Sequence, residues 1–150
     1  MRDPRELARQ FIQQNHVMTL ATVGDDGVWA SAVYYNSDFK RNQLNFQFLS
    51  AKTTRHAQNI AKNSRISATI QENVRIWRDI RGIQMEGLCR ELLKTERDLA
   101  IKGYIQRFPE VEDEPDLAKA LTRVSWYELV PDKLLYIDNS VRLGHRDIIL

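Results

Sequence analysis

The residues best suited to chemistry lie in one short segment, SAKTTRH, which runs from Ser50 to His56. An alternating, strand-like run precedes it and an amphipathic, helix-like run follows it. The first turn of a helix offers unpaired backbone N–H groups and the positive end of the helix dipole. Hydroxyls of Ser50 and Thr54 add donors, Arg55 can fork two bonds to an oxyanion, and His56 can add one more. The segment therefore predicts a phosphate site.

An ordinary helix start explains the same residues. In that interpretation Thr54 is a capping residue, and the Arg55 and His56 side chains lie in water. The residue types alone agree with both the phosphate site and the ordinary helix start.

The other reactive residue types have plainer interpretations. Cys89 alternates with apolar neighbours and is expected to be a small buried hydrophobe. His16 is expected to be structural, and Trp77 and Trp126 to be packing residues. His145 lies between Arg142 and Arg146, so this part of the tail is either a site for a substrate anion or a solvated basic surface.

The periodicity predicts mainly strands in the first two thirds of the chain. Helices are expected at residues 2–14, where Asp3 and Pro4 suit the first turn, and at 54–63. A polar loop is expected at 36–42. Strands are predicted for residues 16–23, 28–35, 44–50, 65–70 and 80–92, the first two joined as a hairpin by GDDG.

The last third predicts a helix at 94–108, capped by Thr95, then an acidic loop at 110–116 and a short helix. Two strands, 123–130 and 133–138, and an irregular tail follow. Because short strands joined by turns outnumber helices, the order favours an antiparallel, mainly β barrel of the α+β class with flanking helices.

Composition narrows the class of protein. The 150 residues suit one domain, and a net charge of +2 argues against a nucleic-acid-binding protein. The single cysteine cannot form an internal disulfide, and no apolar run suits a membrane span or a signal peptide. We expect a cytoplasmic protein without a metal site.

Three stretches carry a family resemblance: ATVGDDGVWASAVYY, FQFLSAKTTRHAQNIAKNSRISATI and RGIQMEGLCREL. In this order and spacing, the chain resembles the pyridoxamine 5′-phosphate oxidase-like proteins, which bind FMN in a split β-barrel. The nearest likeness is to a small bacterial branch that also carries TRHAQ. The resemblance implies a single Greek-key-like, antiparallel split-barrel domain over residues 1–150.

The resemblance also implies the cofactor and its site. The phosphate group of FMN would be bound by Ser50, Thr54, Arg55 and His56. The isoalloxazine ring would lie beside the strand segment Ser31, Ala32, Val33 and Tyr34, whose backbone groups suit the pyrimidine edge. The remaining expected contacts are Gln84 and, from the second chain of a homodimer, Trp126, Arg142 and His145.

Three positions depart from the family pattern. His56 replaces a lysine, Gly82 stands where the oxidase has glutamine, and Ile137 stands where it has tryptophan. Gln84 lies on the same strand face as Gly82 and is expected to replace the missing glutamine. These changes argue against pyridoxamine phosphate as substrate and leave FMN unaffected.

The function expected from the resemblance is that of a flavin-dependent oxidoreductase acting on an unidentified small molecule or electron donor. Two alternatives stand beside it. One is a protein that binds flavin or another phosphorylated ligand without turnover. The other is a haem-binding relative, for which an exposed His145 would be the axial ligand.

Overall fold

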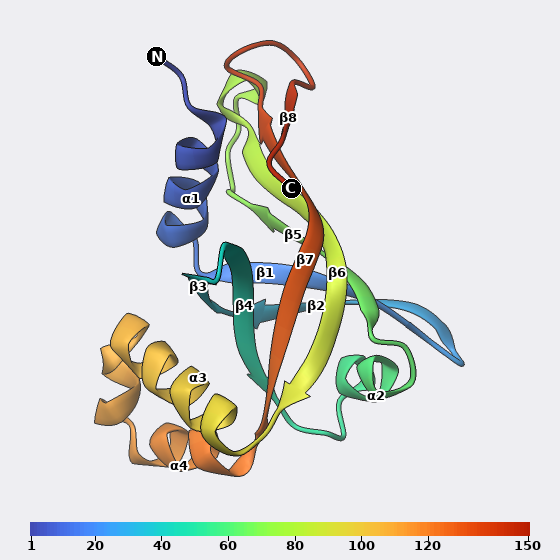
Figure 1. The fold of residues 1–150 in the computed structure, drawn as a ribbon, viewed down its shortest axis with the longest axis vertical. Coiled ribbons are helices and arrows are strands. Elements are labelled where there is room, and N and C mark those ends of the chain that lie inside the picture. The colour runs from blue at the N-terminus through green and yellow to red at the C-terminus, as the bar shows by residue number, and fades with distance from the viewer.

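The computed structural model describes all 150 residues, and most of them belong to one antiparallel sheet (Figure 1). The strands are β1 Val17–Gly24, β2 Gly27–Tyr34, β3 Asn36–Lys40, β4 Gln43–Ser50, β5 Arg65–Gln71, β6 Arg81–Leu92, β7 Ser125–Asp138 and β8 Arg146–Ile148. The helices are α1 Pro4–Gln14, α2 Arg55–Lys62, α3 Lys94–Arg107 and α4 Pro115–Arg123, with short 3-10 turns η1 Trp77–Asp79 and η2 Pro109–Asp113.

The strands follow the order β2-β1-β5-β6-β7-β4-β3, with β8 beside β7, and every pairing is antiparallel. The sheet bends strongly but no ladder joins its ends, so β2 and β3 remain edge strands. The mainly antiparallel fold with flanking helices is confirmed, and its form is an open, split barrel. None of its helices combines the length and apolar character that crossing a bilayer requires.

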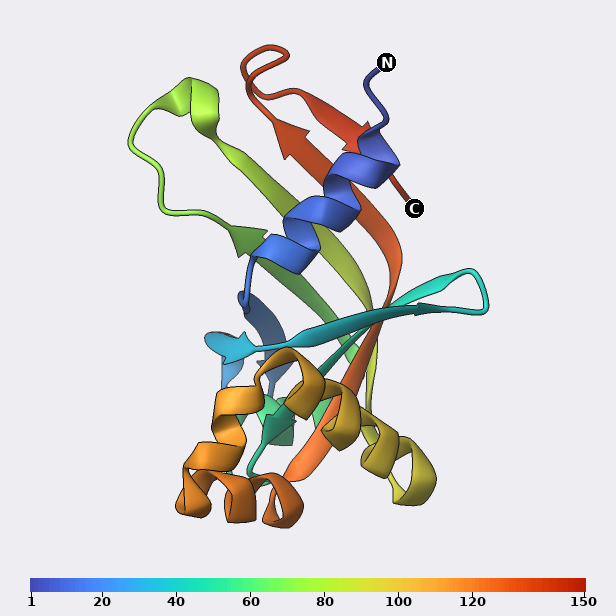
Figure 2. The same cartoon turned by 90° about the vertical axis from the view of Figure 1, so that its left-hand side faces the viewer.

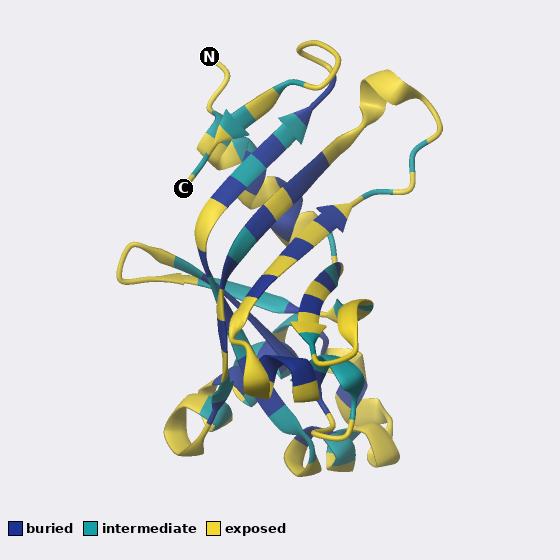
Figure 3. Ribbon diagram, turned by 90° about the vertical axis from the view of Figure 1, so that its right-hand side faces the viewer, coloured by how far each residue is buried: buried dark blue, intermediate teal, exposed yellow.

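Two hydrophobic clusters hold the elements together. The larger lies inside the bent sheet and includes Phe11 of α1, Phe48 of β4 and Ile60 of α2. The smaller lies between the sheet and the α3–α4 region, around Tyr104 and Trp126. Buried and exposed residues alternate along β5, as the period of two predicts (Figure 3).

Glycine at position 87 allows β6 to bend against β7. A bulge lies between Glu86 and Gly87, and a Cβ on Gly87 would stand 2.1 Å from the carbonyl oxygen of Val130. The bulge bends this strand, and glycine at this position permits the close approach of the two backbones.

The structure corrects three of the predicted elements. Residues 36–42 form β3 and a tight turn, in which Arg41 and Asn42 have positive φ, instead of a loop. The two strands expected at 123–130 and 133–138 are one strand, β7, whose Pro131 lies at the bulge. The acidic loop contains η2.

The structure also corrects the predicted cap of α3 and buries two polar residues of β4. The residue before α3 is Leu93, and no side chain caps this helix, so Thr95 is not its cap. Asn45 and Gln47 are buried although they alternate with apolar residues, because their side chains bond to Asp38 and Glu128.

Candidate functional site

The predicted phosphate segment connects the end of β4 to the first turn of α2. Ser50 pairs with Ser125 of β7, which fixes the end of the strand. Thr54 is the N-cap of α2: its backbone is extended and its hydroxyl accepts the Ala57 N–H at 3.2 Å. The capping prediction for this helix is therefore confirmed.

Three polar side chains converge at this helix start. The Ser50 hydroxyl lies 2.8 Å from the Thr54 hydroxyl and 2.8 Å from Nε2 of His56. The backbone N–H groups of Arg55 and His56 make no hydrogen bond within the chain. The first turn of α2 holds no acidic residue. The Ser50 and Thr54 hydroxyls also lie within hydrogen-bond distance of the Ala51 carbonyl oxygen, at 3.1 and 3.0 Å. The two free N–H groups and the positive dipole end are therefore what the helix start offers to an anion.

Arg55 makes a different set of contacts from its neighbours. Its Nη2 donates to the backbone carbonyl of Asp26 at 2.9 Å, and its guanidinium carbon lies 4.4 Å from the centre of the Trp29 ring. Its Nε is buried and has no hydrogen-bond partner. The guanidinium is thus held beside the β1–β2 hairpin, and no carboxylate of the chain pairs with it.

Burial affects the charge of His56. The imidazole is partly enclosed, and desolvation lowers its pKa below the ordinary histidine value. In the free protein near neutral pH, His56 is therefore largely uncharged. A nearby phosphate dianion would favour the protonated form and raise the pKa again.

The position of α2 is fixed by a buried contact with β1. The Asn59 amide donates to the Thr22 hydroxyl at 3.0 Å, and Gly24 leaves room for the Asn59 side chain. This contact holds the helix start against the hairpin that supplies Trp29. The sequence pattern did not reveal this contact, because it joins two residues that are 37 positions apart.

The strand predicted to lie beside the flavin ring is β2, an edge strand. It pairs only with β1, so half of its backbone N–H and C=O groups are not used by the sheet. Ala32 and Tyr34 are exposed on its outer side. Ser31 and Val33 are half-buried on the other side, and the Ser31 hydroxyl oxygen is buried without a partner.

Strand register connects this edge to Gln84. Ala32 pairs with Thr19, Thr19 with Thr69, and Thr69 with Gln84. Ala32 and Gln84 therefore belong to one row of side chains on the outer face of the sheet, and Gln84 is exposed there. They are three strands apart.

Of the other three predicted residues, Trp126 is next to Ser125, the pairing partner of Ser50, whereas Arg142 and His145 lie away from α2. Trp126 has no exposed surface, and its indole N–H donates to the Leu121 carbonyl oxygen at 2.8 Å. Because its own chain encloses the ring, we leave Trp126 out of the proposed site. Arg142 and His145 lie in the β7–β8 region, at the opposite end of the molecule from α2 (Figure 1).

His145 is bonded within its own chain. Its Nε2 lies 3.1 Å from a carboxylate oxygen of Asp147, which also accepts a bond from Arg2 at 2.7 Å. The Nδ1 atom is buried without a partner. Asp147 thus occupies Nε2 and burial covers Nδ1, so His145 does not present the exposed nitrogen that an axial ligand of haem would need.

A cavity of about 850 Å³ opens beside Tyr34, one of the predicted flavin contacts. More than half of its lining residues are apolar. The lining includes residues that the sequence analysis assigned to packing or did not consider, among them His16, Leu49, Tyr104, Phe108, Val111 and Leu117. They come from β4, α3, η2, α4 and the loop positions His16 and Phe108, so no local sequence pattern links them.

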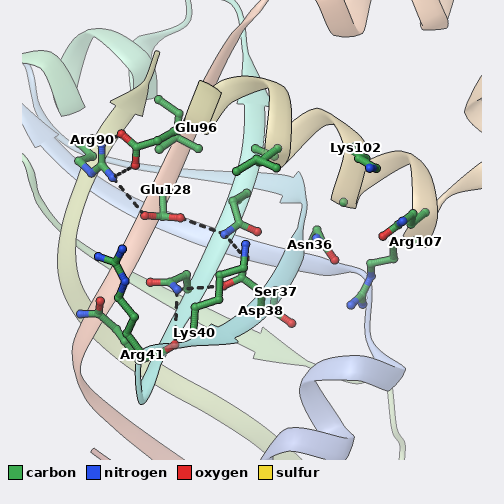
Figure 4. Close-up of a pocket in the computed structure, with 18 residues that line it drawn as sticks. Asn36, Ser37, Asp38, Lys40, Arg41, Arg90, Glu96, Lys102, Arg107 and Glu128 are labelled. Atoms are coloured by element: carbon green, nitrogen blue, oxygen red, sulfur yellow. Dashed lines mark hydrogen bonds and ion pairs between the residues drawn. The ribbon is translucent and has the colours of Figure 1, made fainter. Parts of the chain in front are cut away.

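A second, polar groove of about 790 Å³ lies between α3 and the β3–β4 hairpin (Figure 4). Some of its charges pair with one another: Arg90 contacts Glu96 and Glu128, and Lys40 contacts Asp38. None of the predicted site residues lines this groove.

The fold and the α2 segment together define a class: a split-barrel protein with a polar helix start beside an edge strand. Comparison with known families agrees with this class. The family model described as pyridoxamine 5′-phosphate oxidase matches residues 4–138, and the chain belongs to that family.

Individual relatives are more distant. The UPF0306 protein YhbP of Escherichia coli O157:H7 is 29% identical over 139 residues, which cover 93% of this chain and 88% of that protein. A protein from Listeria innocua described as a putative pyridoxamine 5′-phosphate oxidase superposes with a TM-score of 0.65 at 14% identity. The match covers 89% of this chain and 98% of that one.

A heme binding protein from Mycobacterium smegmatis superposes with a TM-score of 0.76 at 18% identity, over 99% of this chain and 58% of that one. Likeness at these identities establishes the fold and leaves the ligand to the site itself.

Proposed function

We propose that this protein binds FMN and acts as a flavin-dependent oxidoreductase on a small molecule. The observation that carries the proposal is the convergence of Ser50, Thr54 and His56 at the start of α2, with the free N–H groups of Arg55 and His56. Such a site suits the terminal phosphate of FMN better than a neutral ligand.

Two buried polar atoms without a hydrogen-bond partner would find one on FMN. The buried Nε of Arg55 lacks an acceptor, which a phosphate oxygen would supply. The Ser31 hydroxyl on β2 also lacks a partner, and the unpaired backbone edge of β2 can bond the polar edge of a flavin. The residues present therefore fit FMN.

FMN supplies the redox chemistry when bound, so no side chain needs to act as a nucleophile. The chain contributes binding and orientation. Ser50, Thr54, Arg55 and His56 would hold the phosphate, and β2 from Ser31 to Tyr34 would align the ring. The apolar cavity beside Tyr34 would exclude water and admit a substrate with an apolar body.

We also propose a homodimer with a site at each subunit interface. Arg142 and His145 are at the far end of the chain from α2, so only a second copy could bring them to the same flavin. Gln84 stays in the proposed site because it shares a row on the outer face of the sheet with Ala32 of β2.

The absorption spectrum of the purified protein tests the proposal. The expected result is the pair of flavin absorption bands in the visible and near-ultraviolet range. These bands should be retained after gel filtration or regained when FMN is added. A sharp Soret band after growth with haem would assign the protein to the haem binders instead. A colourless protein that rejects added FMN would refute the proposal.

A further inference from the structure

The polar groove lies where α3 runs beside the β3–β4 hairpin (Figure 2). Its volume of about 790 Å³ falls in the range of about 300–1,000 Å³ that is typical of small-molecule sites. Only three of its 18 lining residues are hydrophobic, so a ligand there must itself be polar (Figure 4). Since no residue proposed to bind FMN lines the groove, it is separate from the proposed flavin site.

The floor of the groove is a row of polar side chains across four strands. Asn36 of β3 pairs with Gln47 of β4, Gln47 pairs with Glu128 of β7, and Glu128 pairs with Arg90 of β6. Paired residues lie side by side on one face of a sheet, and all four line the groove. The floor is therefore built on the sheet and not on a loop.

Gln47 leaves one acceptor unused at this floor. The residue is only 3% exposed, and its Nε2 donates to Asp38 at 3.1 Å and to Glu128 at 3.0 Å. Its Oε1 is buried and has no hydrogen-bond partner, so a donor is missing there. Because the carboxylates of Asp38 and Glu128 lie beside it, this acceptor suits a donor that carries positive charge, such as a protonated amine.

The walls of the groove offer unpaired positive charge. Of its five cationic residues, two pair with carboxylates of the same groove, and Arg107 donates to the backbone carbonyls of Ile12 and Gln13. Arg41 of the β3–β4 turn and Lys102 of α3 are exposed and make no ion pair. These two side chains lie on opposite sides of the groove (Figure 4). Each wall can therefore pair with an anionic group.

We propose that this groove binds an acidic amino acid, either free or as the first residue of a peptide. The protonated amine of the ligand donates to Oε1 of Gln47, and its two carboxylates pair with Arg41 and Lys102. One ammonium and two carboxylates match the single unused acceptor and the two unpaired cations. A ligand without the amine leaves Gln47 unsatisfied, and a ligand with one carboxylate leaves one cation unpaired.

Isothermal titration calorimetry of the unaltered protein with four small ligands tests the proposal. L-glutamate and L-glutamylglycine each carry one ammonium and two carboxylates, and the tighter of the two identifies the source of the ligand. Glutarate, which lacks the amine, is expected to bind at least about 10-fold more weakly, because a bond between a charged donor and a buried acceptor is lost. 4-Aminobutyrate, which lacks one carboxylate, is expected to bind about threefold more weakly or worse, since the cations are exposed.

Two results of this titration would overturn the proposal. One is that neither L-glutamate nor L-glutamylglycine binds at about 10 mM, which corresponds to an affinity too weak for a site. The other is that glutarate or 4-aminobutyrate binds as tightly as L-glutamate. Neither result depends on whether the protein binds flavin, because the two sites share no residue.

Variants of the walls test whether the ligand lies in this groove. Arg41→Asn/Lys102→Ala is expected to bind L-glutamate about 10-fold more weakly than the wild type. Asparagine tolerates the positive φ of 54° at position 41, and alanine suits the helix at position 102. Lys119→Ala, which removes an exposed lysine of α4 outside the groove, is the control and should bind like the wild type. Wild-type affinity of the double variant would overturn the proposal.

Discussion

Arg55 is the residue on which the phosphate site depends most. Stacking on Trp29 and one bond to the Asp26 carbonyl orient its guanidinium, while its Nε keeps no partner. Arg55→Ala is expected to weaken FMN binding by about 1.5–3 kcal/mol, the range for a bond to a charged group. Fluorescence titration measures this, with Arg55→Lys as the control that keeps the charge and loses the fork. An unchanged dissociation constant for Arg55→Ala would remove it from the site.

At the proposed site, we expect His56 to make FMN binding depend on pH. Burial lowers the pKa of the free imidazole, and a bound phosphate favours its charged form. Binding therefore takes up a proton, so the affinity rises as pH falls through the raised pKa of the complex and levels off below the pKa of the free protein.

His56→Gln is the matched control, because the phosphate itself titrates with a pKa of about 6 and this variant retains only that term. Titrations of both proteins from alkaline to mildly acidic pH give the comparison. Identical pH profiles would show that His56 does not contact the phosphate.

The residues of the site could be predicted only as far as local pattern reaches. The Thr54 cap and the helix start follow from the order of residue types, and the structure agrees. The contact between Arg55 and Trp29 joins residues 26 positions apart, and no periodicity predicts it. Trp126 was expected to contact the flavin, but only the fold reveals that its ring is enclosed.

At the scale of elements, the β6–β7 bulge lies within the larger hydrophobic cluster, between Met85 and Cys89 of β6. Gly87→Ala places a methyl group against the Val130 carbonyl and the Pro131 Cα, both backbone atoms that cannot rotate away. We expect a loss of about 1–3 kcal/mol in the free energy of unfolding, measured with denaturant.

Gly103→Ala is the control for this substitution. Its nearest atom is the flexible Asn36 amide, and alanine is favoured over glycine within α3 by up to about 1 kcal/mol. Equal stability of Gly87→Ala and the wild type would mean that the bulge tolerates a side chain and does not require glycine.

Strands and helices with clear alternation or an amphipathic stripe could be predicted, and those with polar composition could not. β3 has the sequence NSDFK, which reads as a loop, and pairing with β4 makes it a strand. β7 contains Pro131, which suggested a break, but the bulge opposite Gly87 accommodates the proline without ending the strand. In both cases the tertiary partner decides the local structure.

At the scale of the whole molecule, the start of α2 and the β7–β8 loop lie at opposite ends, and the sheet between them is open (Figure 1). The proposed contacts of Arg142 and His145 with a flavin at α2 therefore require a second chain. The order of three motifs predicted the family, and the family model and the fold confirm it. No periodicity in the sequence reports which charged surfaces the fold leaves exposed.

The central claim is that the α2 helix start binds the phosphate of FMN. Its most direct test is equilibrium binding of FMN and of riboflavin, which lacks the phosphate, to the same protein at the same pH and salt. Since charge-assisted hydrogen bonds contribute about 1.5–3 kcal/mol each, FMN is expected to bind at least about 100-fold more tightly. Equal affinities for the two flavins would contradict the account.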